Sequence, residues 1–152
     1  MKIEFYGVRG STPTPGKNTL IFGGNTSCVY ISLDNGHNVV LDSGTGIVEL
    51  GERLEKTKHP INILLTHNHW DHIQGFPYFR PIFQTNRDIS IVTGNVDGDD
   101  KDAILTQMSG STHPVKFGQL PANIKVDIKS SALKQFEIPG FEVNTQRLNH
   151  PD

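Results

Sequence analysis

Residues 64–72 read LLTHNHWDH and place three of the chain's seven histidines within six positions, directly behind an apolar run. In an extended segment alternate side chains point the same way, so His67 and His69 can converge on one ion. Asp71 and His72 then face a second position a short way along the chain. Because imidazole and carboxylate groups are ligands of zinc, iron and manganese, we interpret the cluster as part of a metal centre. A solvated loop that happens to be rich in histidine is the alternative.

Short apolar runs separated by turn residues indicate a chain in which strands outnumber helices. The expected strands cover residues 2–8, 26–33, 38–42, 61–66, 89–93, 124–128 and 141–148. The turn at 34–36 predicts a hairpin between the second and the third of these strands. Apolar residues at helical spacing over 47–54 predict a helix whose start is capped by the side chain of Thr45 or Ser43, and residues 103–108 predict a short second helix. The fold class expected from this order is α+β, with the sheet dominant.

The composition limits the compartment and the partners that we expect. A chain of 152 residues with 35% hydrophobic residues is long enough for one domain with its own core. The net charge of -2 provides no general attraction to nucleic acids or to anionic membranes. The single cysteine, Cys28, excludes an internal disulfide framework and fits a reducing compartment. Residues 1–10 contain no long apolar region, so we expect no signal peptide. No apolar stretch approaches the ~20 residues of a bilayer span, and we therefore expect a cytoplasmic protein that does not bind membranes.

The motif H-x-H-x-D-H behind an apolar strand resembles the metal-binding motif of the metallo-β-lactamase superfamily. The segment around Asp42, VVLDSGTGI, resembles the one that precedes this motif and places Asp42 at the position of the family's buried aspartate. Two further segments resemble the opening of the branch of cyclic-phosphodiesterase-like or phosphonate-pathway hydrolases: GVRGSTPTPG at 7–16 and FGGNTSCV at 22–29. The segment at 148–151, LNHP, resembles the one that carries the next metal-binding histidine of that branch, His150.

The resemblance implies a centre for two divalent metal ions, with zinc expected first and manganese or iron as alternatives. The ligands implied for the first ion are His67, His69 and His150. Those implied for the second ion are Asp71 and His72, and Asp71 is also the residue that we expect to take part in catalysis. Asp42 would fix the tautomer and orientation of a ligand histidine through a hydrogen bond. The alternative for Asp42 is a cap or turn hydrogen bond at the end of a strand.

Relatives of this type continue beyond the segment that carries His150. They add a bridging aspartate, a last histidine ligand and the second half of a four-layer αββα sandwich. The resemblance therefore implies the N-terminal half to two-thirds of a metallo-β-lactamase-type sandwich, as a single domain over residues 1–152 that is C-terminally incomplete. The second metal site is expected to be incomplete as well, because it keeps Asp71 and His72 alone. We expect either a portion of a longer enzyme or a shortened product that pairs with another chain, for example as a homodimer.

The function implied by the resemblance is a metal-dependent hydrolase that cleaves small or cyclic phosphodiesters through a metal-bound hydroxide. A tRNA 3′-end processing nuclease carries the same motif and is the alternative that would make nucleic acid the partner, although no basic arm is visible in the sequence. Thioester or lactone hydrolysis also occurs on this fold. From a different class, a catalytically impaired metal-binding module would need another chain or the rest of a longer one.

Three other residues have two interpretations each. Trp70, inside the motif, is expected to pack below the metal loop, and a place at the substrate entrance is its alternative. Arg9 and Ser11 lie in the loop rich in Gly and Pro after the first strand. We expect both to be plain turn residues, and contact with a phosphate, which suits Arg, is the alternative.

Overall fold

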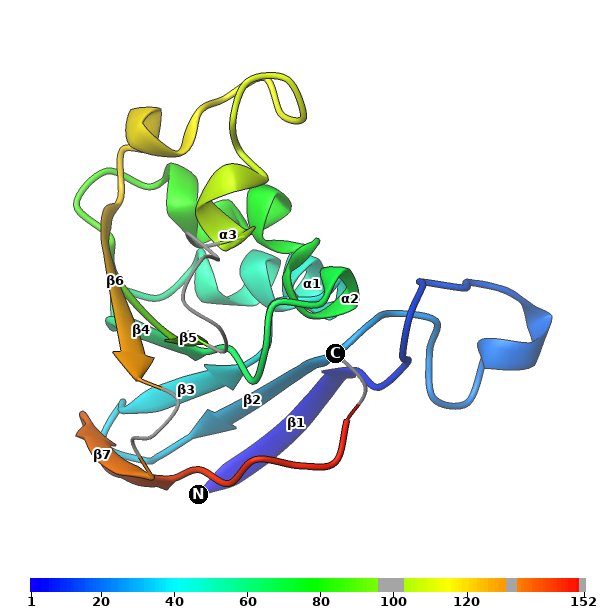
Figure 1. Cartoon of the computed structure of the whole chain (residues 1–152), viewed down its shortest axis with the longest axis horizontal. Coiled ribbons are helices and arrows are strands. Elements are labelled where there is room, and N and C mark those ends of the chain that lie inside the picture. The colour runs from blue at the N-terminus through cyan, green and yellow to red at the C-terminus, as the bar shows by residue number, and fades with distance from the viewer. Residues whose placement is uncertain (96–102, 131–133, 151–152) are drawn as a thin grey trace.

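Six strands form one mixed sheet in the part of the chain that the computed structural model describes, residues 1–95, 103–130 and 134–150 (Figure 1). They are β1 (Lys2–Gly7), β2 (Cys28–Ser32), β3 (Asn38–Leu41), β4 (Ile61–Leu64), β5 (Asp88–Asn95) and β6 (Asn123–Ser130). The strands lie side by side in chain order, from β1 at one edge to β6 at the other. A separate antiparallel pair consists of β7 (Gln135–Ile138) and β8 (Phe141–Asn144).

The sheet changes from antiparallel to parallel pairing at β3, and this change places two functional segments at the same edge. β1, β2 and β3 pair antiparallel, and in the β2–β3 turn the N–H of Leu33 donates to the carbonyl oxygen of His37 at 2.8 Å. β3, β4, β5 and β6 pair in parallel. The carboxyl ends of β3 and β4 therefore lie together, and the N–H of Asp42 donates to the carbonyl oxygen of Leu64 at 2.9 Å.

Short helices gather on one side of this sheet and bury its apolar residues (Figure 1). They are α1 (Gly46–Leu54), α2 (Trp70–Ile73), α3 (Ala103–Thr106) and the 3-10 turns η2 (Phe76–Tyr78) and η3 (Arg80–Phe83). On β4, Ile61 and Ile63 belong to the core cluster, whereas Asn62 between them points to the opposite face of the sheet. Fully buried members of the core are Ile47, Leu50, Phe76, Phe79, Ile82, Ile89 and Ile91. The core thus lies between the sheet and the helices, and it anchors the loops that follow β3 and β4.

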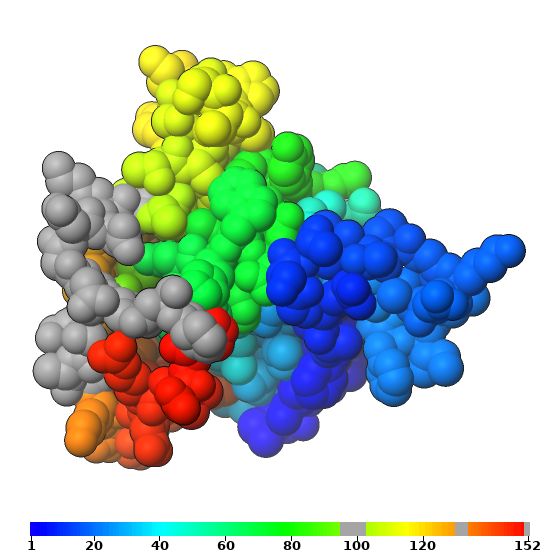
Figure 2. All heavy atoms as spheres, turned by 45° about the vertical axis from the view of Figure 1, so that its right-hand side comes forward, coloured from blue at the N-terminus to red at the C-terminus, as the bar shows by residue number. Residues whose placement is uncertain are grey.

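The connection between β1 and β2 projects from the body of the structure, as the blue segment of Figures 1 and 2 shows. It contains η1 (Lys17–Thr19) and leaves Leu20, Ile21 and Phe22 almost fully exposed. At its base the Nε of Arg9 donates to the carbonyl oxygen of Thr12 at 3.1 Å and to the hydroxyl of Thr14 at 2.9 Å. The expected turn role of Arg9 is therefore confirmed.

The predicted α+β class is confirmed, because a mixed sheet with helices is present. The seven predicted strands correspond to β1–β6 and β8, with their ends shifted by a few residues, and the hairpin at 34–36 joins β2 to β3. β7, α2, the 3-10 turns η1–η3 and a further one, η4 (Phe117–Gln119), were not predicted. No helix within the described ranges has the length and the apolar character that a membrane crossing requires.

The expected packing of Trp70 below the metal loop is wrong. Its side chain is 58% exposed, because Trp70 opens the short helix α2, whose buried positions are occupied by Asp71 and Ile73. The aromatic ring therefore faces solvent beside the histidine motif.

Candidate metal centre

Three histidines from two distant segments of the chain meet beyond the carboxyl end of β4. His67 and His69 lie between β4 and α2, and His150 lies in the stretch that follows β8. Ring centroids are 4.5 Å apart for His67 and His69, 4.9 Å for His67 and His150, and 5.0 Å for His69 and His150. One ligand atom of each ring lies within 4.8 Å of those of the other two. In the part of the chain that the structure describes, this is the one such group of three potential ligands.

The three imidazoles fit a divalent ion in chemistry and, after a small movement, in spacing. Two nitrogen atoms ~2.0–2.1 Å from a tetrahedral zinc ion are ~3.4 Å apart. The side chains of His69 and His150 are exposed, so rotation about their bonds can bring the nitrogens from within 4.8 Å to this spacing. The Nε2 of His67 is buried and has no hydrogen-bond partner. A bound ion would therefore satisfy a buried polar atom that the protein leaves unsatisfied.

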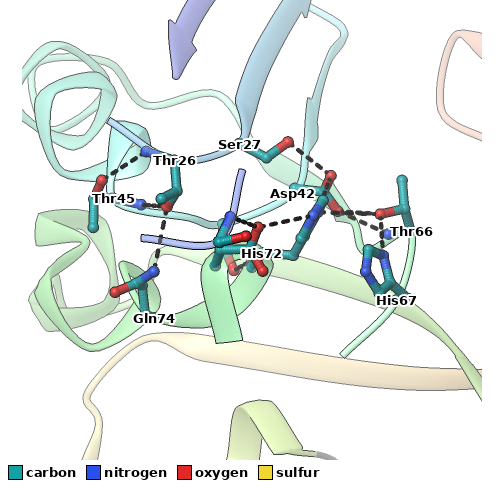
Figure 3. A network of polar contacts seen from close by, with 11 residues as sticks. Thr26, Ser27, Asp42, Thr45, Thr66, His67, His72 and Gln74 are labelled. Carbon is teal, nitrogen blue, oxygen red and sulfur yellow. Dashed lines mark hydrogen bonds and ion pairs between the residues drawn. The ribbon is translucent and has the colours of Figure 1, made fainter. Parts of the chain in front are cut away.

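Asp42 holds the loop after β4 and the helix α2 together through its buried carboxylate (Figure 3). Its Oδ1 accepts hydrogen bonds from the backbone N–H of Thr66 at 2.8 Å and from the Thr66 hydroxyl at 2.9 Å. Its Oδ2 accepts from the Ser27 hydroxyl at 3.0 Å and lies 2.8 Å from Nδ1 of His72. From the sequence, a hydrogen bond at the end of the strand and a contact with a histidine were alternatives for Asp42. The structure shows both. Its role toward a metal ligand stays a prediction.

The backbone of Asp42 adopts a left-handed conformation, with φ of 62°. Such a conformation is uncommon outside glycine and is tolerated best by Asp and Asn. The four hydrogen bonds to the carboxylate hold the residue in place, and the turn after β3 thus directs the carboxylate toward Thr66 and His72.

Close backbone packing fixes α2 against the β3–α1 turn. The N–H of Ser43 donates to the carbonyl oxygen of His72 at 2.7 Å, and the N–H of Gly75 donates to the carbonyl oxygen of Ser43 at 2.9 Å. A Cβ atom at Gly44 would collide with the carbonyl of Asp71, so only glycine permits this approach. The carboxyl-terminal part of α2 is therefore held by backbone contacts to the β3–α1 turn, and these contacts place His72 beside Asp42.

Thr45 is the N-cap residue of α1 but makes no cap hydrogen bond. Its hydroxyl instead accepts from the backbone N–H of Thr26 at 2.9 Å and donates to Oδ1 of Asn25 at 3.1 Å. The hydroxyl of Thr26 in turn accepts from the N–H of Thr45 at 2.8 Å (Figure 3). The predicted start of the helix is thus nearly right, whereas the predicted capping bond is replaced by a tie to the segment before β2.

Asp71 and His72 lie next to each other on α2, with 3.5 Å between Asp71 Oδ2 and His72 Nε2. The backbone N–H of Ser11 donates to Asp71 Oδ2 at 2.8 Å, from a residue with φ of 66°. Sequence reasoning missed this contact, because a backbone donor carries no signature of residue type. Within the described residues, no third His, Cys, Asp or Glu completes a group of three around this pair. The pair offers two donors, and its role as a second metal site stays a prediction.

The surroundings shift the pKa values of the cluster in opposite directions. Burial lowers the pKa of His67, and the neighbouring His72 and His69 lower it further. The His67 ring therefore stays neutral down to a lower pH than an ordinary histidine does. The hydrogen bond to Asp42 raises the pKa of His72, although burial opposes it. Burial acts to raise the pKa of Asp71, but the Ser11 amide and the charge of His72 outweigh it and hold the pKa below its ordinary value. Asp71 is therefore an anion at neutral pH.

In the metal-free protein, we expect His72 to titrate above its ordinary pKa of about 6.5. A raised pKa in the folded state means that protonated His72 stabilises the fold fully below pH ~6.5, and that this contribution is lost as the pH rises through the folded pKa. NMR titration of the His72 ring measures the shift, and the Asp42→Asn variant should lower it, because an amide does not favour the imidazolium. Thr45→Val, whose hydroxyl contacts neither residue, is the control. Titration of His72 below 6.5 in the wild type would contradict the expectation.

Comparisons with known proteins match this chain to a family and to a fold. The sequence model of the Metallo-beta-lactamase superfamily matches residues 21–147. No curated protein matches the sequence. Among solved structures, the chain is similar to Zn(2+)-bound PqqB from Methylobacterium extorquens, with a TM-score of 0.58 and 20% sequence identity. The match covers 93% of this chain and 54% of that chain, so the sequence spans about half the length of this solved structure. At this level of identity the likeness supports the fold alone.

Proposed function

Because the chain belongs to the metallo-beta-lactamase superfamily, whose members are generally metal-dependent hydrolases, we propose that it carries the metal centre of a hydrolase for small or cyclic phosphodiesters. The observation that carries the proposal is the meeting of three histidines around the buried and unpartnered Nε2 of His67. Imidazole ligands of this kind suit zinc first, with manganese or iron as alternatives.

The preference for a phosphodiester rests on the two segments that resemble the phosphodiesterase branch. Both segments contact the cluster, although neither contains a histidine. The segment 7–16 supplies the Ser11 amide that holds Asp71, and the segment 22–29 supplies the Ser27 hydroxyl that holds Asp42. The two segments that resemble the branch therefore lie at the site itself, and this placement supports the branch's substrate class over thioesters and lactones.

In this proposal His67, His69 and His150 hold the ion, and Asp71 with His72 lies beside it. A divalent ion held there supplies Lewis-acid activation of water and neutralises the charge that develops on the phosphoryl oxygens. The contact with Asp42 fixes the orientation of the His72 ring, and the hydrogen bond from the Ser11 amide fixes the orientation of the Asp71 carboxylate. Asp42 and Asp71 would repel an anionic phosphodiester, so the protein alone offers a poor site for this substrate and depends on the cation.

A second candidate, a metal-binding module without activity of its own, is favoured by one observation. The pair of Asp71 and His72 has no third ligand among the residues that the structure describes. If two ions are needed for chemistry, this chain would require donors from elsewhere, such as a second copy or another segment of a longer protein.

We expect the metal-loaded protein to hydrolyse bis(p-nitrophenyl) phosphate, and we expect His69→Ala to lower this activity by at least about 100-fold, because a ligand is removed. His59→Ala is the matched control, since His59 is an exposed histidine outside the cluster. Activity that survives His69→Ala would contradict the metal centre. Cleavage of a thioester or lactone in place of the phosphodiester would overturn the substrate class. Metal-loaded protein that cleaves no ester would favour the module without activity.

A further inference from the structure

Thr66 lies between the buried carboxylate of Asp42 and the first histidine of the cluster. Its Oγ1 is 2.9 Å from Oδ1 of Asp42 and 3.0 Å from Nδ1 of His67 (Figure 3). We propose that the Thr66 hydroxyl links the Asp42 carboxylate to His67 and so sets the tautomer of that ring, in addition to the direct contact of Asp42 with His72. Thr66 is then a positioning residue that presents the Nε2 lone pair of His67 to the metal position. This inference rests on the proposed metal centre.

Counting protons assigns the direction of each hydrogen bond. A threonine hydroxyl has one proton to donate and can accept at its oxygen, whereas an ionised carboxylate only accepts. The 2.9 Å contact with Asp42 Oδ1 joins two acceptors unless the Thr66 proton lies on it. With that proton used, Thr66 Oγ1 can meet His67 Nδ1 only by accepting, so Nδ1 of His67 carries a hydrogen.

The same count applies to His72. Its Nδ1 is 2.8 Å from Oδ2 of Asp42 and 3.4 Å from Oγ1 of Thr66. Asp42 cannot donate, so the Nδ1 of His72 does, and the shorter contact identifies Asp42 as its main partner. Both histidines therefore carry hydrogen on Nδ1, so the neutral form of each ring keeps its lone pair on Nε2.

The surroundings of the Nε2 atom of His67 agree with this assignment. Nε2 of His67 is buried and has no acceptor nearby, so a hydrogen there would be an unsatisfied donor. A lone pair at the same place is ready to bind a cation. His67 also lies at the centre of the cluster, with the rings of His69, His72 and His150 at 4.5, 4.1 and 4.9 Å. The tautomer of this one ring thus decides whether the cluster presents a donor or a ligand.

The test uses Thr66→Val, which keeps the branched shape of the side chain and removes the hydroxyl, and Thr66→Ser, which keeps the hydroxyl. Long-range ¹H–¹⁵N NMR of the metal-free protein, above the pKa range of histidine, reports the tautomer of His67. We expect hydrogen on Nδ1 in the wild type and in Thr66→Ser, and a shift toward hydrogen on Nε2 in Thr66→Val. Zinc affinity should fall about 10- to 100-fold in Thr66→Val and stay near wild type in Thr66→Ser.

Thr45→Val is the matched control, because it removes a threonine hydroxyl that belongs to the same region but touches neither Asp42 nor a histidine. Hydrogen on Nε2 of His67 in the wild type would overturn the proposal without any variant, even if Thr66→Val does not fold. An unchanged tautomer and unchanged zinc affinity in Thr66→Val would overturn it too. If the tautomer shifts as expected but the wild type binds no metal, the positioning role stands and the proposed metal centre fails.

Discussion

The His67→Ala variant is expected to lose zinc affinity by about 100-fold or more while keeping its fold. Structural zinc sites contribute about 10–16 kcal/mol through four ligands, so one ligand is worth roughly 3 kcal/mol, which corresponds to about 100-fold. His67 should show the largest effect of the three histidines, because its Nε2 is buried and unpartnered, whereas His69 and His150 are exposed. Competition titration with a zinc chelator measures the affinity.

The stability of the metal-free protein separates this loss from unfolding. His67→Ala removes a buried nitrogen without a partner and one contact between Nδ1 and Thr66, so the free energy of unfolding of the metal-free variant should stay within about 1.5 kcal/mol of the wild type. His37→Ala is a suitable control, because His37 is an exposed histidine in the β2–β3 turn. An equal loss of zinc affinity in His37→Ala, or none in His67→Ala, would show that the ion binds elsewhere.

The Asp42→Asn variant is expected to lose both stability and zinc affinity. Asn tolerates the left-handed backbone at φ of 62°, so the substitution isolates the change of charge and acceptors. The carboxylate accepts from two groups on Thr66, from Ser27 and from His72, and an amide turns one of its two oxygens into a donor. At least two buried donors lose their acceptor, at about 1–3 kcal/mol each. We expect a decrease of about 2–4 kcal/mol in the free energy of unfolding of the metal-free protein.

The expected decrease in zinc affinity of Asp42→Asn is about 10- to 100-fold, in line with other carboxylates that orient ligand histidines. Urea denaturation gives the first quantity and chelator competition the second. Asp34→Asn is the control, because Asp34 is fully exposed at the β2–β3 turn. If the free energy of unfolding of Asp42→Asn lies within about 0.5 kcal/mol of the wild-type value, the network around Asp42 does not stabilise the fold.

The predictable part of this site is the part that depends on local geometry. His67 and His69 are two positions apart in a segment without regular structure, and their rings lie 4.5 Å apart, as alternation along an extended chain requires. Asp42 and Thr66 follow adjacent parallel strands, so strand ends at a common edge bring them together. His150 lies far along the chain, and the resemblance to a family named it where no rule of spacing could.

Contacts made by the backbone, and elements too short to show a period, could not be predicted. The Ser11 amide donates to Asp71 from a segment rich in Gly and Pro. Such a composition predicts a turn, but it does not predict which residue the turn contacts. α2 spans only Trp70–Ile73, which is too short for a helical pattern, so the exposure of Trp70 was missed. β7 alternates between exposed and half-buried residues, and this weak pattern did not mark it as a strand.

The most direct test of the account is zinc-edge X-ray absorption on protein loaded with one equivalent of zinc. We expect about three imidazole nitrogens at ~2.0–2.1 Å and no sulfur ligand, since Cys28 is buried in the core and does not belong to the group of potential ligands. The number of imidazoles should fall by about one in His150→Ala, the ligand that lies farthest along the chain. A spectrum dominated by oxygen ligands, or one that His150→Ala leaves unchanged, would contradict the three-histidine centre.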